Sequence, residues 1–436
     1  MEVTLHSADS ALERRVFRKL LLFIMPAVLI AFMDRINISF AAPTMNKALS
    51  IDPGIFGLGA GIFFLGYLLF EIPSNIVLAR VGARFWISRI MIVWGLVAVC
   101  GALAAGPLSF LSLRFLLGVA EAGFVPGIML YASYWISTRK LGTFTSLMLL
   151  MIPIAGSVTA VVSSLILGLD GWLGFAGWQW IFILEGVPAV LLGLYGLVYL
   201  PSRPRDASWL NEDEKRRVEE NVRGVVPATR ADGHGAGLAL RNRRTWIYAV
   251  AYLFMNVALG AQPWLPLLFA PLQLTTLQVG LVLASANALA AAAMLAWGRK
   301  SDKAAERPNH LLLSALVAMA GWILCGYANT NILLLTLGIT LALTGMYASL
   351  VVFWTMPTSS LAVEERPVGI ALITCVGLVG SFVAPIITGW LKEGTGTYQG
   401  GMLLAAGGML AAALAVRVGA KATTVRHATQ EREAGT

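Results

Sequence analysis

Long apolar runs, separated by short polar connections, fill the chain from residue 20 to residue 418. A helix needs about 20 apolar residues to cross the hydrocarbon core of a bilayer. On this criterion the pattern predicts twelve membrane-spanning helices, six on each side of a longer polar stretch. The predicted spans are 20–42, 56–79, 84–104, 107–131, 142–168, 178–200, 246–268, 277–296, 310–327, 331–355, 366–391 and 398–418. We therefore expect an all-α membrane protein built from two six-helix bundles.

The composition agrees with a membrane protein and excludes several other classes. Of the 436 residues, 58% are hydrophobic and only 13% are charged, which is about half the charged share usual in soluble proteins. This balance excludes a soluble enzyme, a disordered chain and a secreted disulfide scaffold. Cys100, Cys325 and Cys375 lie far apart within apolar runs and form no metal or redox motif. We find no catalytic motif in the sequence, and we predict neither an enzyme nor a cofactor nor a metal site.

The basic residues are distributed unevenly between the two sets of loops. Of the 32 Lys and Arg residues, 28 lie in the terminal segments and every second loop or at the adjoining ends of spans. Lys47 and Lys392 lie in the other loops, and Arg35 and Arg114 lie deeper within spans. This asymmetry predicts that both termini are cytoplasmic, in a multi-pass protein of the inner membrane. The net charge of +9 then reflects topology and contact with lipid, and we expect no binding of nucleic acid.

The polar stretch divides the chain into three parts. They are a first bundle at 1–200, a cytoplasmic linker at 201–245, and a second bundle with a cytoplasmic tail at 246–436. Within the linker, Asn211 and Glu214 have the spacing of a helix capping box, which predicts a short surface helix. A piece rich in Gly and Ala at 231–239 is expected to be flexible.

A short basic motif recurs after the second and the eighth predicted span. A shift of 223 residues places Arg80 on Lys303 and Arg84 on Arg307. Both copies resemble the Gly-x-x-x-Asp-Arg-x-Gly-x-Arg loop of the major facilitator superfamily, although the first lacks the leading Gly and the Asp and the second lacks the later Gly. The residues that we expect to form or brace a gate are Glu71, Arg80, Gly82, Arg84, Gly298, Asp302 and Lys303. The resemblance implies two six-helix bundles that alternate access to a site at the bilayer midplane.

A narrower resemblance extends along nearly the whole chain. Five segments are similar to the anion:cation symporter family, and within it to bacterial carriers of tartrate, phthalate, hydroxyphenylacetate and sugar acids. They are FMDR (32–35), GYLLFEIPSN (66–75), RFLLGVAEAG (114–123), FWTMPT (353–358) and GIAL (369–372). Members of that family take up organic anions with protons. The resemblance implies a secondary transporter whose partners are a small organic anion, protons and the lipid bilayer, and we expect it to act as a monomer.

Four charged residues, Asp34, Arg35, Arg114 and Glu121, interrupt the apolar runs of the first and fourth predicted spans. Each ionised group costs at least about 2.5–3.5 kcal/mol at the bilayer centre on insertion scales. One interpretation is a pair of buried salt bridges that only holds helices together. The other is that the arginines bind a substrate carboxylate in a bidentate manner while the acids take up and release protons. We favour the second, because apolar residues often replace a buried ion pair without loss of stability.

The resemblance also implies a role for each of these residues. Asp34 and Glu121 match the proton-coupling acids of the family, Arg35 matches the arginine that meets the substrate carboxylate, and Arg114 matches one that pairs with an acid. For Glu185, within the sixth span, we favour a structural role. The other residues that we expect to line the substrate site are Phe32, Tyr67, Trp354, Thr355 and Thr374.

Some positions depart from the sugar-acid carriers of the family. Phe32 stands where those carriers commonly have Tyr, and Thr374 and Leu378 stand where they have an Asn pair. An amide is also missing around Ile152. Fewer hydrogen-bonding groups favour a less hydroxylated substrate, such as an aromatic acid or a small dicarboxylate like tartrate. A sugar-acid symporter, a proton-independent exchanger of organic anions and a transporter-like sensor remain as alternatives.

Overall fold

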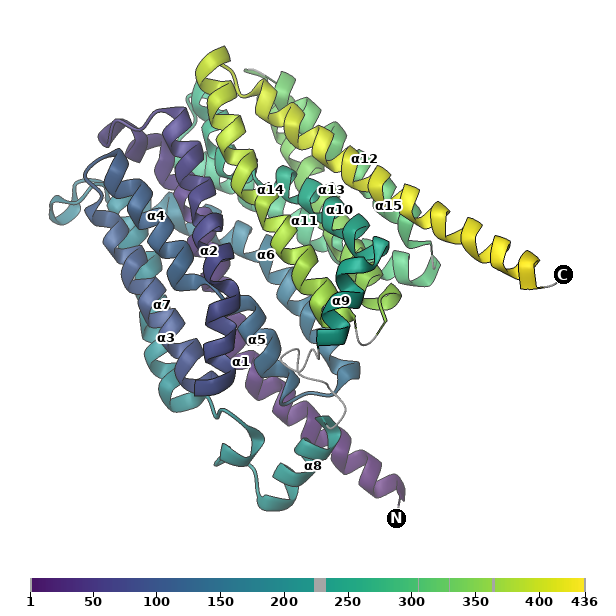
Figure 1. Cartoon of the computed structure of the whole chain (residues 1–436). Coiled ribbons are helices and arrows are strands. Elements are labelled where there is room, and N and C mark those ends of the chain that lie inside the picture. The colour runs from purple at the N-terminus through teal and green to yellow at the C-terminus, as the bar shows by residue number, and fades with distance from the viewer. Residues whose placement is uncertain (1, 223–232, 305, 329, 363–364, 435–436) are drawn as a thin grey trace.

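The structure is a computed structural model, and it describes residues 2–222, 233–304, 306–328, 330–362 and 365–434. This part of the chain is helical (Figure 1). The first half comprises α1 (Glu2–Ala48), α2 (Pro53–Val81), α3 (Ala83–Cys100), α4 (Pro107–Glu121), α5 (Phe124–Ser133), α6 (Thr138–Ile166) and α7 (Gly177–Tyr199). The linker contains α8 (Glu212–Val222) and α9 (Gly233–Arg241). The second half comprises α10 (Arg243–Leu259), α11 (Thr276–Ala304), α12 (Arg307–Tyr327), α13 (Ile332–Ser360), α14 (Arg366–Thr395) and α15 (Gln399–Ala434).

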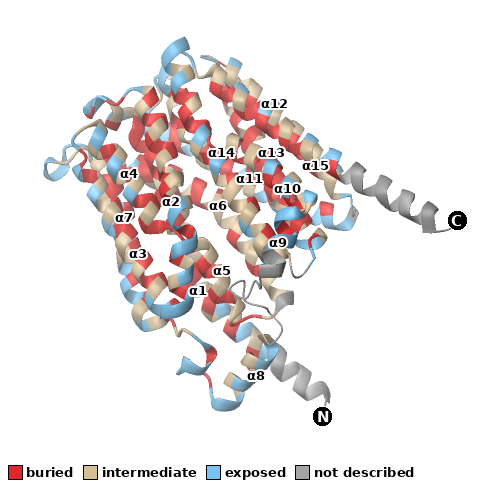
Figure 2. Ribbon diagram, in the orientation of Figure 1, coloured by how far each residue is buried: buried red, intermediate tan, exposed pale blue. Residues whose placement is uncertain are grey.

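The helices have the length and composition of membrane spans. Among the described residues, eleven candidate spans are found, and there are twelve if a bent pair in the second half counts as one span. Large apolar side chains such as Leu191 and Leu289 lie exposed in the middle of their helices. Figure 2 shows such exposed positions alternating with buried ones along the outer helices. An apolar outer surface of this kind suits lipid rather than water, and the predicted all-α membrane fold is confirmed.

Two spans that the sequence predicts as continuous helices are broken. The predicted span 107–131 divides between α4 and α5, where Gly123 has a φ of +82°. A Cβ atom at Gly123 would lie 2.6 Å from Ser74 Oγ, so the break also lets α2 approach closely. In the predicted span 246–268, two short 3-10 helices follow α10, and the chain bends by 43° before Pro266. Proline has no amide hydrogen to donate, which accounts for the interrupted ladder.

The order of the spans brings both chain termini to one end of the molecule, where α8 and α9 also lie (Figure 1). We call this end the terminal side. The loop between α1 and α2 and the loop between α14 and α15 lie at the opposite end, which we call the far side.

The two halves meet along two close seams in the far half of the molecule. In the first seam, α2 packs on α14, and a Cβ atom at Gly57 would lie 2.3 Å from the Pro385 carbonyl oxygen. In the second seam, α6 packs on α11, and a Cβ atom at Gly280 would lie 2.4 Å from the Ala160 carbonyl oxygen. Ser157 Oγ also donates across this seam to the Ala284 carbonyl oxygen at 2.9 Å. Small residues therefore bring the backbones of the two halves into direct contact at the far side.

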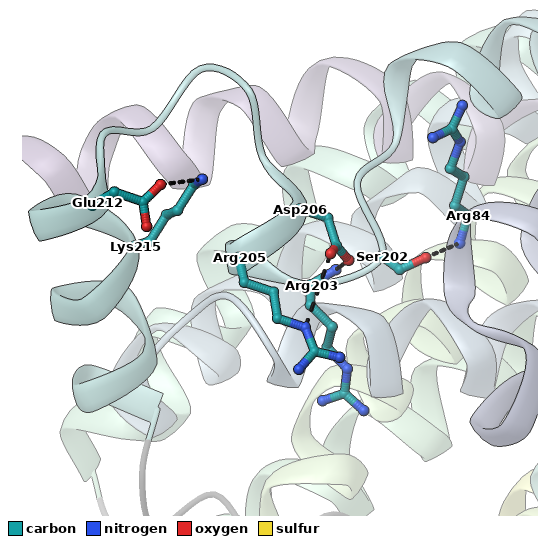
Figure 3. A network of polar contacts seen from close by, with 7 residues as sticks. All are labelled: Arg84, Ser202, Arg203, Arg205, Asp206, Glu212 and Lys215. Carbon is teal, nitrogen blue, oxygen red and sulfur yellow. Dashed lines mark hydrogen bonds and ion pairs between the residues drawn. The ribbon is translucent and has the colours of Figure 1, made fainter.

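The linker begins with a network of local polar contacts (Figure 3). The Arg84 amide donates to Ser202 Oγ at 3.3 Å, and Lys215 Nζ lies 2.8 Å from Glu212 Oε1. The predicted capping box is present, because the Glu214 amide donates to Asn211 Oδ1 at 2.9 Å and the Asn211 amide donates back to Glu214 Oε2 at 3.1 Å. These bonds start α8 where the sequence predicts a helix.

Glu214 also docks α8 on α1 through an ion pair of 2.7 Å with Arg15. The hydrogen bond from the Asn211 amide, followed by the contact with Arg15, lowers the pKa of Glu214 below its usual range. Downstream, the prediction of a flexible piece at 231–239 is wrong for residues 233–239, which belong to α9. Alanine and leucine within α9 favour a helix despite its glycines. Residues 231 and 232 lie outside the described part of the chain.

Candidate functional site

The four charged residues of the first half come together between α1 and α4, with an ion pair at their centre. Arg35 Nε and Nη2 lie 2.8 and 2.6 Å from the same oxygen of Glu121, Oε1. The Glu121 side chain is fully buried, whereas 17% of the Arg35 side chain is exposed. The second oxygen of Glu121, Oε2, is buried and has no hydrogen-bond partner among the described residues. Arg35 thus has a strong partner and still keeps part of its side chain exposed.

Arg114 is the second arginine of this cluster, and it is nearly fully buried. Its Nε atom donates to the Gly59 carbonyl oxygen at 3.3 Å, and its Cζ atom lies 5.1 Å from the centre of the Phe63 ring. Asp34 and Glu121 both lie close enough to act on the Arg114 charge. In this conformation Arg114 is therefore held by a backbone carbonyl and an aromatic face, and Arg35 forms the direct ion pair with Glu121.

Asp34 lies beside Asn37, whose Nδ2 atom donates to Asp34 Oδ1 at 3.3 Å. The other carboxylate oxygen, Oδ2, is buried and unpartnered within the part of the chain that the structure describes. Asn37 also lies beside Glu185, whose Oε1 accepts a hydrogen bond of 2.5 Å from Ser163. A polar chain through α1, α6 and α7 thus joins Glu185 to the charged cluster.

Aromatic rings surround the Arg35 guanidinium. Its Cζ atom lies 5.4 Å from the centre of the Phe32 ring, 5.6 Å from Phe63 and 4.9 Å from Tyr67. These distances are typical of cation–π contacts, which orient a planar guanidinium. The structure therefore brings the predicted residues Phe32 and Tyr67 to Arg35. It adds Phe63, which the sequence analysis missed although it lies one helical turn before Tyr67.

The second half faces this cluster with aromatic residues. Trp354 and Tyr252 meet edge to face with ring centres 5.0 Å apart, and Tyr252 lies close enough to Arg35 for an electrostatic interaction. Sequence analysis predicted Trp354 and missed Tyr252. The hydroxyls of Thr355 and Thr374 donate to carbonyl oxygens of their own helices at 2.7 and 3.0 Å, so neither is directed to a substrate in this conformation.

The residues predicted to form a gate lie on the terminal side of this cluster. Glu71 is buried one helical turn from Tyr67, where Arg35 acts on its charge. Arg80, Gly82 and Arg84 form the junction of α2 and α3, and Gly82 has a φ of +94°. The residues of the second copy, Gly298, Asp302 and Lys303, lie inside α11 rather than in a loop. The two copies therefore differ in local structure, because Gly82 separates two helices with a positive φ, whereas Gly298 lies within α11.

A small cavity lies between the halves, and Ile36, next to Arg35 in the chain, is one of its lining residues. Its polar lining consists of Ser39 from α1, Gln262 after α10, Asn287 from α11 and Tyr347 from α13. Sequence analysis missed these residues. The available signal was their position as uncharged polar residues within long apolar runs, where hydrogen-bonding groups are costly unless they have partners. The described residues contain no cluster of three or more His, Cys, Asp or Glu side chains that could hold a metal ion.

Comparison with known proteins identifies the family. The family described as Major Facilitator Superfamily matches residues 24–385. Two proteins of Agrobacterium vitis, each named "Putative tartrate transporter", are 39% and 38% identical to this chain. The first match covers 96% of this chain and all of the relative, and the second covers 92% and 91%. The inner membrane transport protein RhmT of Escherichia coli K12 is 33% identical over 85% of this chain and 86% of its own.

Solved structures agree at the level of the fold. A partially occluded, inward-open structure of the xylose transporter XylE from E. coli superimposes with a TM-score of 0.73 and 15% identity. That match covers 92% of this chain and 96% of the other. The chain belongs to the major facilitator superfamily, a family of transporters and not of enzymes. It is a multi-pass membrane protein. Its curated relatives resemble members of the anion:cation symporter family, as its motifs predict.

Proposed function

We propose that the protein is a secondary transporter that carries an organic carboxylate together with protons by alternating access. The observation that carries this proposal is Arg35, a partly exposed arginine inside an otherwise buried and charge-balanced cluster. A guanidinium at that position is suited to a carboxylate because its planar fork can donate two parallel hydrogen bonds.

Charge balance supports the coupling to protons. Asp34, Arg35, Arg114 and Glu121 together carry no net charge when all four are ionised. A substrate carboxylate adds one negative charge in a region of low dielectric, where an uncompensated charge is expensive. Protonation of Asp34 or Glu121 restores neutrality, and each acid has one buried oxygen without a partner among the described residues. Substrate and proton are therefore favoured together in the site.

The proposed direction of access follows from the contacts between the halves. The far side is closed by the α2–α14 and α6–α11 seams, while the Arg35 side chain remains partly exposed. The site thus communicates with the terminal side, which the excess of Lys and Arg in its loops assigns to the cytoplasm. We propose that the bundles at 1–200 and 246–436 move as units, joined by the linker at 201–245, in a protein that acts as a monomer.

A small dicarboxylate such as tartrate is the favoured substrate. Arg35 and Arg114 offer one cation for each of two carboxylates, and two relatives have names that mention tartrate. The aromatic rings around Arg35 also favour an aromatic acid. A sugar acid and proton-independent exchange remain the competing proposals.

Transport by purified protein in proteoliposomes tests these proposals. We expect labelled tartrate to accumulate under an imposed proton gradient, acid outside, and to stop accumulating when the gradient is collapsed. Arg216→Ala, on the exposed surface of α8, serves as a matched control for Arg35→Ala. Uptake that is unaffected by the gradient would identify an exchanger or facilitator. Absence of uptake of tartrate, aromatic acids and sugar acids alike would refute carboxylate transport.

A further inference from the structure

The cavity between the halves contains a continuous chain of uncharged hydrogen-bonding groups. Gln262 Nε2 donates to the Tyr347 hydroxyl at 3.0 Å, and that hydroxyl donates to Asn287 Oδ1 at 3.5 Å. Tyr347 and Asn287 are buried. The three side chains come from three separate segments of the second half, and all three face the same cavity. This convergence is unusual in apolar spans, because a buried polar group costs free energy in the membrane unless it has a hydrogen-bond partner.

The cavity lies within reach of a molecule that is held by Arg35. Ser39 is four residues after Arg35 on α1, so it lies on the same face of the helix and about 6 Å further toward the far side. Ile36, Ser39 and Phe40 are the α1 residues that line the cavity, and Gln262 and Tyr347 belong to the same lining. A substrate whose carboxylate binds Arg35 would need to extend only a few bonds toward the far side to meet this lining.

The lining determines which chemical groups are favoured there. Amides and hydroxyls can both donate and accept hydrogen bonds, and they match alcohol groups well. The residues that line the cavity include no Lys, Arg, Asp or Glu. A second ionised carboxylate would therefore lack a counter-charge in this cavity, whereas a hydroxyl group would find partners.

We infer that Gln262, Asn287 and Tyr347 form a subsite that binds the hydroxyl groups of a hydroxylated carboxylate held at Arg35. This inference rests on the proposed function and makes its substrate class more specific. It also reverses the preference for a less hydroxylated acid, which was drawn from missing amides in α6 and α14. The hydrogen-bonding groups are supplied instead by α11, α13 and the segment after α10.

A structural alternative is that the same residues only close the far side. Asn287 belongs to the α6–α11 seam, where a Cβ atom at Gly156 would lie 2.4 Å from Asn287 Oδ1. If closure were their entire role, removal of the Tyr347 hydroxyl would affect all substrates by the same factor. A subsite instead predicts an effect that depends on the number of hydroxyl groups in the ligand.

Binding of two matched series of acids to the purified full-length protein separates these cases. The first series consists of tartrate, malate and succinate, four-carbon diacids with two, one and no hydroxyl groups. The second consists of mandelate and phenylacetate, aromatic acids with and without a hydroxyl. For whichever series binds, we expect affinity to fall about tenfold or more for each hydroxyl removed, measured by ligand-dependent thermal stabilisation.

Tyr347→Phe should remove most of this difference by weakening the hydroxylated acids and leaving the parent acids unchanged. Asn287→Leu should act in the same direction. Tyr327→Phe, at an exposed tyrosine of α12, is the matched control and should leave the preference intact. The melting temperature of the unliganded variants checks that each one is folded.

The outcomes distinguish a failure of the proposed subsite from a failure of the proposed transport function. Equal affinity for hydroxylated and unhydroxylated acids, or an equal loss for all acids in Tyr347→Phe, overturns the subsite while leaving carboxylate transport in place. A preference for hydroxyl groups that survives both variants also overturns it. If no acid of either series and no sugar acid binds, and Arg35→Ala changes nothing, the proposed function itself fails.

Discussion

The inner faces of the two halves differ in chemistry. The first half presents ions, namely Asp34, Arg35, Arg114 and Glu121, with Glu185 connected to them through Asn37. The second half presents neutral hydrogen-bonding groups and aromatic rings. They are Tyr252, Gln262, Asn287, Tyr347 and Trp354. Both faces border the same central region, and they meet along the far-side seams.

There is a physical reason for ions to lie within one half and for neutral groups to lie in the other. The ion pair between Arg35 and Glu121 joins α1 to α4, so both partners lie in one half. When the halves separate in a transport cycle, such a pair is carried along intact. A buried ion pair across the two halves would have to be broken in every cycle, which is unfavourable because each charge would lose its partner. Temporary exposure costs less free energy for neutral groups, which suits the half that we propose binds the body of the substrate.

Removal of the carboxylate anchor should have the largest effect. Arg35→Ala should weaken substrate binding by about a hundredfold or more, because it deletes the bidentate donor and leaves Glu121 as an unpaired buried acid. Arg35→Lys should restore little, since a single ammonium group cannot replace the planar fork. Substrate titrations of uptake in proteoliposomes measure the effect. Normal substrate affinity in a well-folded Arg35→Ala protein would show that Arg35 of the first half does not bind the substrate carboxylate.

Fixing Glu121 in a neutral form should abolish the coupling of substrate uptake to protons while retaining the exchange of substrate across the membrane. Glu121→Gln keeps the shape and much of the hydrogen bonding but can no longer gain and lose a proton. We expect accumulation under a proton gradient to disappear and counterflow of labelled substrate to persist. Asp34→Asn should behave similarly if both acids share the proton.

Glu185→Gln provides the matched comparison for these two variants, because Glu185 is also a buried acid of the first half. Its hydrogen bond with Ser163 supports a structural role, so accumulation should remain within about twofold of the parent. Loss of accumulation in Glu185→Gln would show that the proton-coupling site extends to α7. If Glu121→Gln accumulates substrate like the parent, the proton-coupling site does not include Glu121 of α4.

The seams between the halves should control which side of the protein is closed. A Cβ atom at Gly57 would lie 2.3 Å from a backbone oxygen of α14, so Gly57→Ala cannot keep the present packing. An overpacking penalty of about 1–3 kcal/mol corresponds to a shift of roughly five- to 150-fold away from the far-closed state. Labelling of single cysteines introduced beside the seam should become faster from the far side.

Gly407→Ala on α15 is the control for this substitution, because a Cβ atom there meets no neighbour within 4 Å. It should leave the labelling rates unchanged. Equal labelling of the Gly57→Ala protein and its parent would show that the α2–α14 seam does not limit opening.

The contact between α8 and α1 should have the smallest effect. Glu214 has a lowered pKa, so its contribution to stability is present above the pKa of the unfolded chain and is lost as the pH falls through its folded pKa. Glu214→Gln should therefore cost about 0.2–1 kcal/mol at neutral pH and nothing in acid. Hydrogen exchange of α8 measures it, with Glu220→Gln as an exposed control. An equal loss at both pH values would contradict an ionic contribution.

Much of the architecture was predictable from the sequence because it depends on local properties. Apolar runs of sufficient length identify spans. The orientation that the positions of Lys and Arg predict stays a prediction. The same reasoning singled out Asp34, Arg35, Arg114 and Glu121, because a charge inside an apolar run is conspicuous without any knowledge of its neighbours. The capping box at Asn211 and Glu214 was predictable for a similar reason, since both partners lie within one turn.

Tertiary structure decided which of these residues meet. Helical spacing places Arg114 and Glu121 on one face of a span, yet Glu121 pairs with Arg35 of α1 and Arg114 donates to a carbonyl of α2. Periodicity gives the direction of a side chain around its own helix, and it contains no information about which helix lies opposite or at what depth. The meeting of Gln262 and Tyr347, which are 85 residues apart, likewise depends on the packing of the segment after α10 against α13. Neutral polar residues within apolar runs give a weaker signal in the sequence than charged ones, and their common cavity appears only when the helices are packed together.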